Sequence, residues 1–148
     1  MIKTITLVLD TSYKNEEHYQ LINDIVGKPL SFFEAIRIGG IGSKRMIVEE
    51  FSPNLRHIEN KSPDINYINI ELRKMGVLIR FTKGLTRFSW AIPFYQLVFY
   101  NKDCSSVHAQ GKYILIKKSK TFHENKNFFD LIRSCLLYTS DAADEVAG

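Results

Sequence analysis

The chain has 148 residues, of which 45% are hydrophobic and 24% charged, and its formal net charge is +4. This length suffices for one domain with its own core, and the composition excludes a disordered or collagen-like chain. No apolar run reaches the roughly twenty residues of a membrane-spanning helix, and the first residues lack a signal-peptide pattern. Cys104 and Cys135 give neither a disulfide framework nor a metal-ligand spacing, so we expect a cytoplasmic protein.

The sequence before residue 30 predicts a strand followed by a short amphipathic helix. Residues 1–10 alternate in the manner of a strand. Ser12 or Asn15 can then cap a helix, and Gly27 ends it. Its apolar residues follow at helical spacing and are Tyr19, Ile22, Ile25 and Val26.

A second short helix and a second strand are predicted next. Ser31 and Glu34 have the spacing of a capping box, and Gly39 with Gly40 ends the helix. Residues 43–50 have the composition of a strand, which Pro53 interrupts.

Residues 66–118 carry the strongest pattern, an alternation of apolar and polar side chains with a period of two. Polar breaks interrupt it at residues 74–76, 83–84, 101–103 and 110–111. The pattern predicts successive antiparallel strands joined by tight turns. One face takes Ile68, Ile70, Leu72, Val77, Ile79, Phe81, Phe88, Trp90 and Ile92, and the opposite face takes Arg73, Arg80, Thr82 and Arg87.

Two segments complete the predicted core. Residues 94–100 are almost all apolar and predict the most buried strand. After the last strand, an amphipathic stripe predicts a helix that covers the sheet, formed by Phe128, Phe129, Ile132 and Leu136. The fold class is therefore α+β, dominated by an antiparallel β meander.

Three segments resemble the bacterial pleckstrin-homology-like family. They are a strand pair around a Lys-x-Gly turn (ELRKMGVLIRF), a strand that runs into an aromatic-proline segment (FSWAIPFYQLVFY) and a closing helix (NFFDLIRSC). The resemblance covers about residues 65–132 and implies a curled partial barrel, closed at one end by the helix. It also implies that the first hairpin is an anion-binding edge. We expect one domain over residues 1–134, with short N-terminal elements in 1–64 and the meander with its helix in 65–134.

The C-terminal stretch CLLYTSDAADE, residues 135–145, resembles the translation of a transposase-type sequencing adaptor. We therefore expect residues 135–148 to be an artefactual tail and the natural end of the protein to be missing. Without the tail's three acidic residues, the net charge rises from +4 to about +7. A genuine polar C-terminus is the alternative.

The sequence carries no motif that predicts a catalytic or metal-binding site. Residues 39–45 (GGIGSKR) lack the order of a phosphate-binding P-loop and indicate a helix end and turn. The alternative is a backbone nest that holds an anion beside Lys44 and Arg45. The four histidines are scattered, and Cys104 has no histidine nearby in the sequence. We therefore expect no catalytic residue, no metal and no cofactor.

The clustering of basic residues is the one feature of this sequence that suggests a function. They surround the first two turns of the meander, with a smaller group upstream, and are Arg73, Lys74, Arg80, Lys83, Arg87, Lys44 and Arg45. A positive face attracts polyanions, although outward Lys and Arg also protect sheet edges from aggregation. We expect a non-catalytic interaction module that binds a protein or an anionic lipid headgroup. The alternatives are a small enzyme whose site is assembled from distant residues and, less favoured, a single-stranded nucleic-acid binder.

Overall fold

The structure, a computed structural model, describes residues 8–31, 34, 37, 42–59 and 66–147. These residues form an α+β fold in which eight antiparallel strands build one open sheet. The strands are β1 (Val8–Asp10), β2 (Met46–Phe51), β3 (Tyr67–Leu72), β4 (Gly76–Lys83), β5 (Thr86–Pro93), β6 (Val98–Phe99), β7 (Ser106–Ala109) and β8 (Lys112–Ile116). The helices are α1 (Glu16–Val26), α3 (Lys120–Glu124) and α4 (Lys126–Ala147), with 3-10 helices η1 (Pro53–Ile58) and η2 (Phe94–Gln96).

The sheet consists of two meanders joined by β2. Its strand order is β1-β5-β4-β3-β2-β8-β7-β6, which leaves β1 and β6 at the edges. Met46 and Ile47 of β2 pair with β3, whereas Val48 to Phe51 pair with β8, and the register shifts between Val48 and Glu50. Such an irregularity bends a strand, so β2 carries the sheet from one half into the other. The strand predicted at residues 43–50, before the meander, therefore lies in the middle of the sheet as β2.

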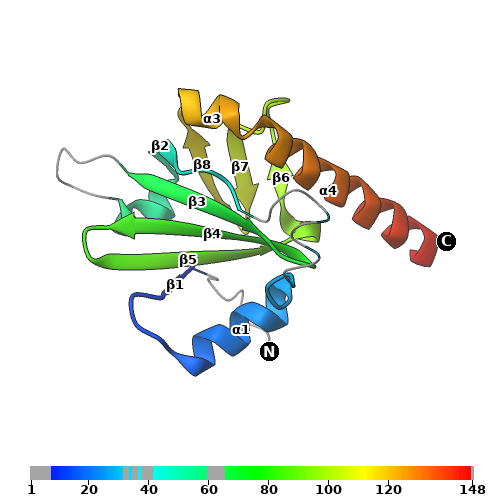
Figure 1. The fold of residues 1–148 in the computed structure, drawn as a ribbon, viewed down its shortest axis with the longest axis horizontal. Helices are drawn as coiled ribbons and strands as arrows, with labels where there is room; N and C mark the ends of the chain where they lie inside the picture. The colour runs from blue at the N-terminus through cyan, green and yellow to red at the C-terminus, as the bar shows by residue number, and fades with distance from the viewer. Residues whose placement is uncertain (1–7, 32–33, 35–36, 38–41, 60–65, 148) are drawn as a thin grey trace.

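The inner face of the sheet carries one continuous core, as the alternation predicted. Side chains of β3, β4 and β5 that share this face, such as Ile70, Ile79 and Trp90, are almost fully buried. After the last strand the chain forms α4, and Phe129 and Ile132 of this helix pack into the same core. Figure 1 shows α3 and α4 along the β6–β8 half of the sheet and α1 beside β4 and β5.

Helix α1 covers part of the opposite face. The Asn15 Oδ1 atom accepts hydrogen bonds from the backbone N–H groups of Glu17 and His18, which caps the helix as predicted. Ile22 and Val26 pack on two outward residues of the sheet, Leu78 of β4 and Ala91 of β5. The sheet therefore has a main core on one face and a small second core under α1.

Gly76 allows this second layer to pack closely. A Cβ atom at this position would lie 2.2 Å from the carbonyl oxygen of Ile92 and 2.8 Å from a methyl carbon of Val26. Only glycine leaves room for both neighbours, because these distances are far below van der Waals contact. The end of α1 is also tied to the β3–β4 turn, where the Met75 N–H donates to the carbonyl oxygen of Val26.

The prediction of a deeply buried strand over residues 94–100 is wrong. Phe94–Gln96 form η2, and only Val98 and Phe99 belong to a strand. Tyr95 is 81% exposed and Tyr100 is 71% exposed. An apolar run alone does not distinguish a strand from a corner, and here the chain turns directly after Pro93.

Other sequence predictions lie partly outside the described residues. They include the start of the first predicted strand, residues 1–7, and most of the second predicted helix. The capping box of that helix lies within the described residues. There Glu34 accepts from the Ser31 N–H, and Ser31 Oγ accepts from the Glu34 N–H. Helix α4 continues to Ala147 and so includes the whole adaptor-like stretch, residues 135–145. Within the described ranges, no helix is both long and apolar enough to cross a membrane.

Candidate functional site

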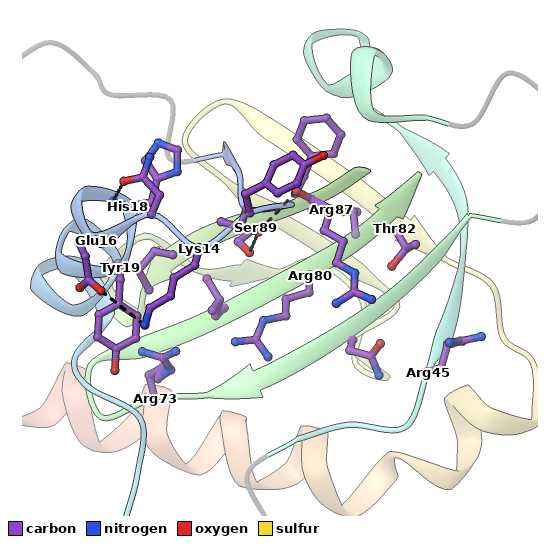
Figure 2. A pocket seen from close by; sticks show the side chains of 18 residues that line it. Lys14, Glu16, His18, Tyr19, Arg45, Arg73, Arg80, Thr82, Arg87 and Ser89 are labelled. Atoms are coloured by element: carbon purple, nitrogen blue, oxygen red, sulfur yellow. Dashed lines mark hydrogen bonds and ion pairs between the residues drawn. The ribbon is translucent and has the colours of Figure 1, made fainter. Parts of the chain in front are cut away.

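A groove of about 830 Å³ lies between α1 and the outer face of β3, β4 and β5. Among its described lining residues are five cationic side chains and one carboxylate, that of Glu16. The cationic residues are Lys14, Arg45, Arg73, Arg80 and Arg87. We call this feature the arginine groove, and Figure 2 shows its side chains.

The strand register explains why the floor of the arginine groove is polar and basic. Arg80 of β4 lies between Asn69 of β3 and Ser89 of β5, and Thr82 lies opposite Arg87. All these positions alternate with core residues, so their side chains share the outer face. Helix α1 covers Leu78 at the other end of this face and leaves the polar end open.

Arg73 lines the groove, but its guanidinium is bound by neighbouring groups of the protein. It is only 4% exposed, although the alternation placed it on the outward polar face. Its guanidinium pairs with Glu71 and donates to the side-chain oxygen of Asn23 and the carbonyl oxygen of Gly27. Arg73 therefore lies on the outer face, as the alternation predicted, but the end of α1 covers it and uses its donors.

The other three arginines present their charge to the groove. Arg80 Nη1 lies 2.8 Å from Glu71 Oε1, yet the Arg80 side chain remains 53% exposed. The guanidinium of Arg45 lies 4.7 Å from the centre of the Tyr67 ring, a cation–π contact that orients it. No carboxylate in the described part of the chain forms an ion pair with Arg45 or Arg87.

The remaining predicted basic residues lie elsewhere. Lys44 Nζ lies 3.3 Å from Glu124 Oε1, and the Lys44 backbone is held by Asn125. Lys74 and Lys83 do not line the groove. The structure thus brings together four of the seven predicted residues, Arg45, Arg73, Arg80 and Arg87.

Sequence reasoning missed the wall of the groove. Lys14, Tyr13 and Tyr19 line it from α1 and from the segment before it, and Tyr13 is 88% exposed. The pattern predicted α1 as a helix, but no local signal gave the part of the sheet on which it packs. Thr82 could have been found, since the alternation already placed its side chain outward.

The lining is rich in hydrogen-bond donors. Guanidinium groups donate only, and hydroxyl groups such as that of Thr82 donate as well as accept. The hydroxyls of Thr11 and Ser89 are engaged with each other at 2.7 Å. Such a surface fits oxygen acceptors that carry negative charge.

Cys104 lies in the connection between β6 and β7. It is 1% exposed, and burial raises the pKa of its thiol, although Arg133 Nε donates to its sulfur at 3.0 Å. A thiol with a raised pKa is mostly protonated at neutral pH and is a weak nucleophile. Among the residues that the structure describes, no group of three or more His, Cys, Asp or Glu is placed to hold a metal ion.

No family model, no curated protein and no solved structure matched this chain.

Proposed function

We propose that this chain is a pleckstrin-homology-like domain that acts in the cytoplasm as a non-catalytic interaction module. The kinship is supported by the bent antiparallel sheet and by α4, which closes the core after the last strand. The pairing of the last strand, β8, with β2 curls the two meanders around one core. The resemblance implies a curled partial barrel built from about residues 65–132, whereas this sheet is open, β2 joins its two halves from outside that range, and β1 and α1 are added to it.

The module binds an anionic group of its partner, a protein or a lipid headgroup, in the arginine groove. The observation that carries this proposal is an excess of positive charge: Lys14 pairs with Glu16 and Arg73 with Glu71, whereas Arg80 stays 53% exposed and Arg45 and Arg87 have no ion pair with a carboxylate of the described residues. A concave surface with one sign of charge concentrates the electric field and attracts ions of the opposite sign. The contact first expected at the hairpin around Arg73, Lys74, Lys83 and Arg87 is therefore moved to the groove, where Arg45, Arg80 and Arg87 would make it.

The test compares two double variants that change charge equally. Arg80→Glu with Arg87→Glu reverses the groove, whereas Lys117→Glu with Lys120→Glu reverses two exposed lysines that do not line it. Binding is measured to polyglutamate and to phosphatidylcholine vesicles with or without phosphatidylserine, at low and high salt. We expect the groove variant to weaken binding about tenfold or more and the control to retain it, because close charges dominate such contacts.

Three results would contradict the proposal. They are binding to no polyanion, equal binding to neutral and acidic vesicles at all salt concentrations, and equal losses in both double variants. The alternative functions give different signals. A single-stranded nucleic-acid binder would bind single-stranded oligonucleotides more tightly than polyglutamate. An enzyme would convert a substrate chemically, which a binding module does not do.

A further inference from the structure

We propose that the arginine groove holds an extended acidic segment of a partner protein, whose carboxylates are bound one by one by Arg45, Arg80 and Arg87. This inference rests on the proposed function and chooses between its two kinds of partner, a protein and a lipid headgroup. It follows from the separation of the three arginines on the outer face of the sheet and from the exposed rings in the wall of the groove.

The three arginines lie apart in the strand register. Continuation of the β2–β3 pairing places Arg45 opposite Asn69, and Asn69 pairs with Arg80. Two strand spacings therefore separate Arg45 from Arg80, or about 10 Å. Arg87 pairs with Thr82 and is a diagonal neighbour of Arg80, at about 7–8 Å. Figure 2 shows Arg45 apart from the other two side chains.

Contacts within the protein keep the three guanidinium groups from converging. Arg80 Nη1 lies 2.8 Å from Glu71 Oε1. Glu71 belongs to β3, whereas Arg87 belongs to β5, so this ion pair draws Arg80 to the side of β4 away from Arg87. The guanidinium of Arg45 lies 4.7 Å from the centre of the Tyr67 ring, also on β3. Each arginine therefore offers its own donors to a ligand.

A carboxylate is the anion that a single arginine can satisfy. Its two oxygens accept two parallel hydrogen bonds from one guanidinium fork. A phosphate group has at least three acceptor oxygens and is bound best by donors that converge on it. Cations spread across the sheet therefore match several carboxylates on one chain better than they match one compact anion.

The extent of the three positions matches a short extended peptide. From β2 to β5 there are three strand spacings, or roughly 14 Å. An extended chain advances about 3.3 Å per residue, and every second side chain lies on the same face. A segment with acidic residues at alternate positions therefore directs its carboxylates at the sheet over about the required length. The long arginine side chains can absorb the remaining differences in spacing.

The wall of the groove offers further contact area to a peptide. Tyr13 is 88% exposed and Tyr19 is 52% exposed, and both line the groove. Such aromatic side chains are enriched at protein interfaces and lose little conformational entropy on binding. The carboxylate of Glu16, the one acid among the described lining residues, is paired with Lys14. A peptide can cover these rings, whereas a small polyanion leaves them exposed.

The first experiment tests the spacing of the carboxylates. Two labelled peptides of the same glutamate and serine composition are compared by fluorescence anisotropy at low salt, one with alternating and one with contiguous glutamates. We expect the alternating peptide to bind about tenfold more tightly. A contiguous run points part of its carboxylates away from the sheet, and each charged hydrogen-bonded contact contributes roughly this factor. Equal affinities of the two peptides would overturn the proposed arrangement.

The second experiment tests whether each arginine holds its own carboxylate. Arg45→Gln and Arg87→Gln should each weaken the alternating peptide about tenfold, and the double variant about a hundredfold. Distant residues with separate partners act independently to within about a factor of two. Lys117→Gln, outside the groove lining, is the matched control and should change nothing. Thermal unfolding shows that each variant remains folded. A double variant no weaker than the single variants would mean that one shared anion is bound.

A third comparison separates this inference from the proposed function. The probes are the alternating peptide, inorganic tripolyphosphate and vesicles that contain phosphatidylserine, and we expect the peptide to bind most tightly. If tripolyphosphate or the vesicles bind more tightly and lose affinity in Arg87→Gln, the proposed function stands and the acidic-peptide partner is wrong. If no anionic probe loses affinity in any arginine variant, both are wrong.

Discussion

Single charged residues in this chain act through their immediate neighbours. Arg73 and Arg80 share Glu71, but the first is buried under α1 and the second faces the groove. Asp103, in the turn between β6 and β7, is a comparable case. Burial alone would raise its pKa, but hydrogen bonds from Lys118 and Ser105 outweigh burial and lower it to about 2.

This shift predicts how stability depends on pH. The pKa of Asp103 is about 2 in the folded state and near 3.8 otherwise, so its stabilisation is present above pH 4 and lost toward pH 2. Because the side chain is 38% exposed, solvent screening reduces the effect to about 1 kcal/mol. We expect Asp103→Asn to lower the free energy of unfolding in urea by this amount at pH 7, and to match the wild type near pH 2.

A difference that stays constant from pH 7 to pH 2 would show that Asp103 acts through packing and not through its charge. Lys118→Gln provides the partner control. Its loss should follow the same pH profile, because Lys118 Nζ lies 2.9 Å from Asp103 Oδ2.

Helix α1 determines whether the open face of the sheet is flat or grooved. The apolar side of α1 packs on Leu78 and Ala91. Its exposed side contributes Tyr19 to the wall of the groove, and Lys14, just before the helix, extends this wall. The Asn15 cap satisfies two backbone N–H groups that would otherwise lack partners. The groove therefore depends on an eleven-residue helix that would be marginal in isolation.

Removal of the cap should weaken the fold and the groove together. We expect Asn15→Ala to lower the free energy of unfolding by about 1 kcal/mol, whereas Asn15→Ser, which also caps, should lose only a few tenths. Chemical denaturation measures both variants. Because the wall is then less well held, polyanion affinity should fall in the alanine variant and recover in the serine variant. Equal stability of the two variants would contradict a capping role.

The two meanders share one continuous core. Trp90 of β5 and Phe129 of α4 belong to the same cluster, although one lies in the sheet and the other in the C-terminal helix. Phe81 packs against Trp90 on the inner face, with ring centres 6.4 Å apart. The bend of β2 makes this possible, since it turns both halves of the sheet toward one interior.

This continuity predicts a single unfolding transition. Phe129→Ala should lower the free energy of unfolding by about 3–5 kcal/mol, the usual cost of a buried aromatic truncated to alanine. The single tryptophan reports on β5, and far-UV circular dichroism reports on the helices and strands together. Both signals should move to the same lower denaturant concentration. If dichroism alone moved while Trp90 fluorescence kept its midpoint, the halves would unfold independently.

The sequence by itself determined the strands from β3 to β5, their inner and outer faces, the capped helix α1 and the apolar stripe of α4. These features follow from side-chain periodicity and local hydrogen bonding, which neighbouring residues decide. Periodicity also placed Arg80, Thr82 and Arg87 on the outer face, so the floor of the groove could be predicted.

Only the tertiary structure decided the burial of Arg73, the corner at residues 94–97, the central place of β2 and the wall that α1 adds to the groove. Each of these depends on which distant segment packs against a given face. A period of two or of 3.6 residues shows that a face is apolar, but it does not show what covers that face. That choice rests on contacts between residues far apart in the chain, such as Val26 with Gly76, which allow the groove to form where it does.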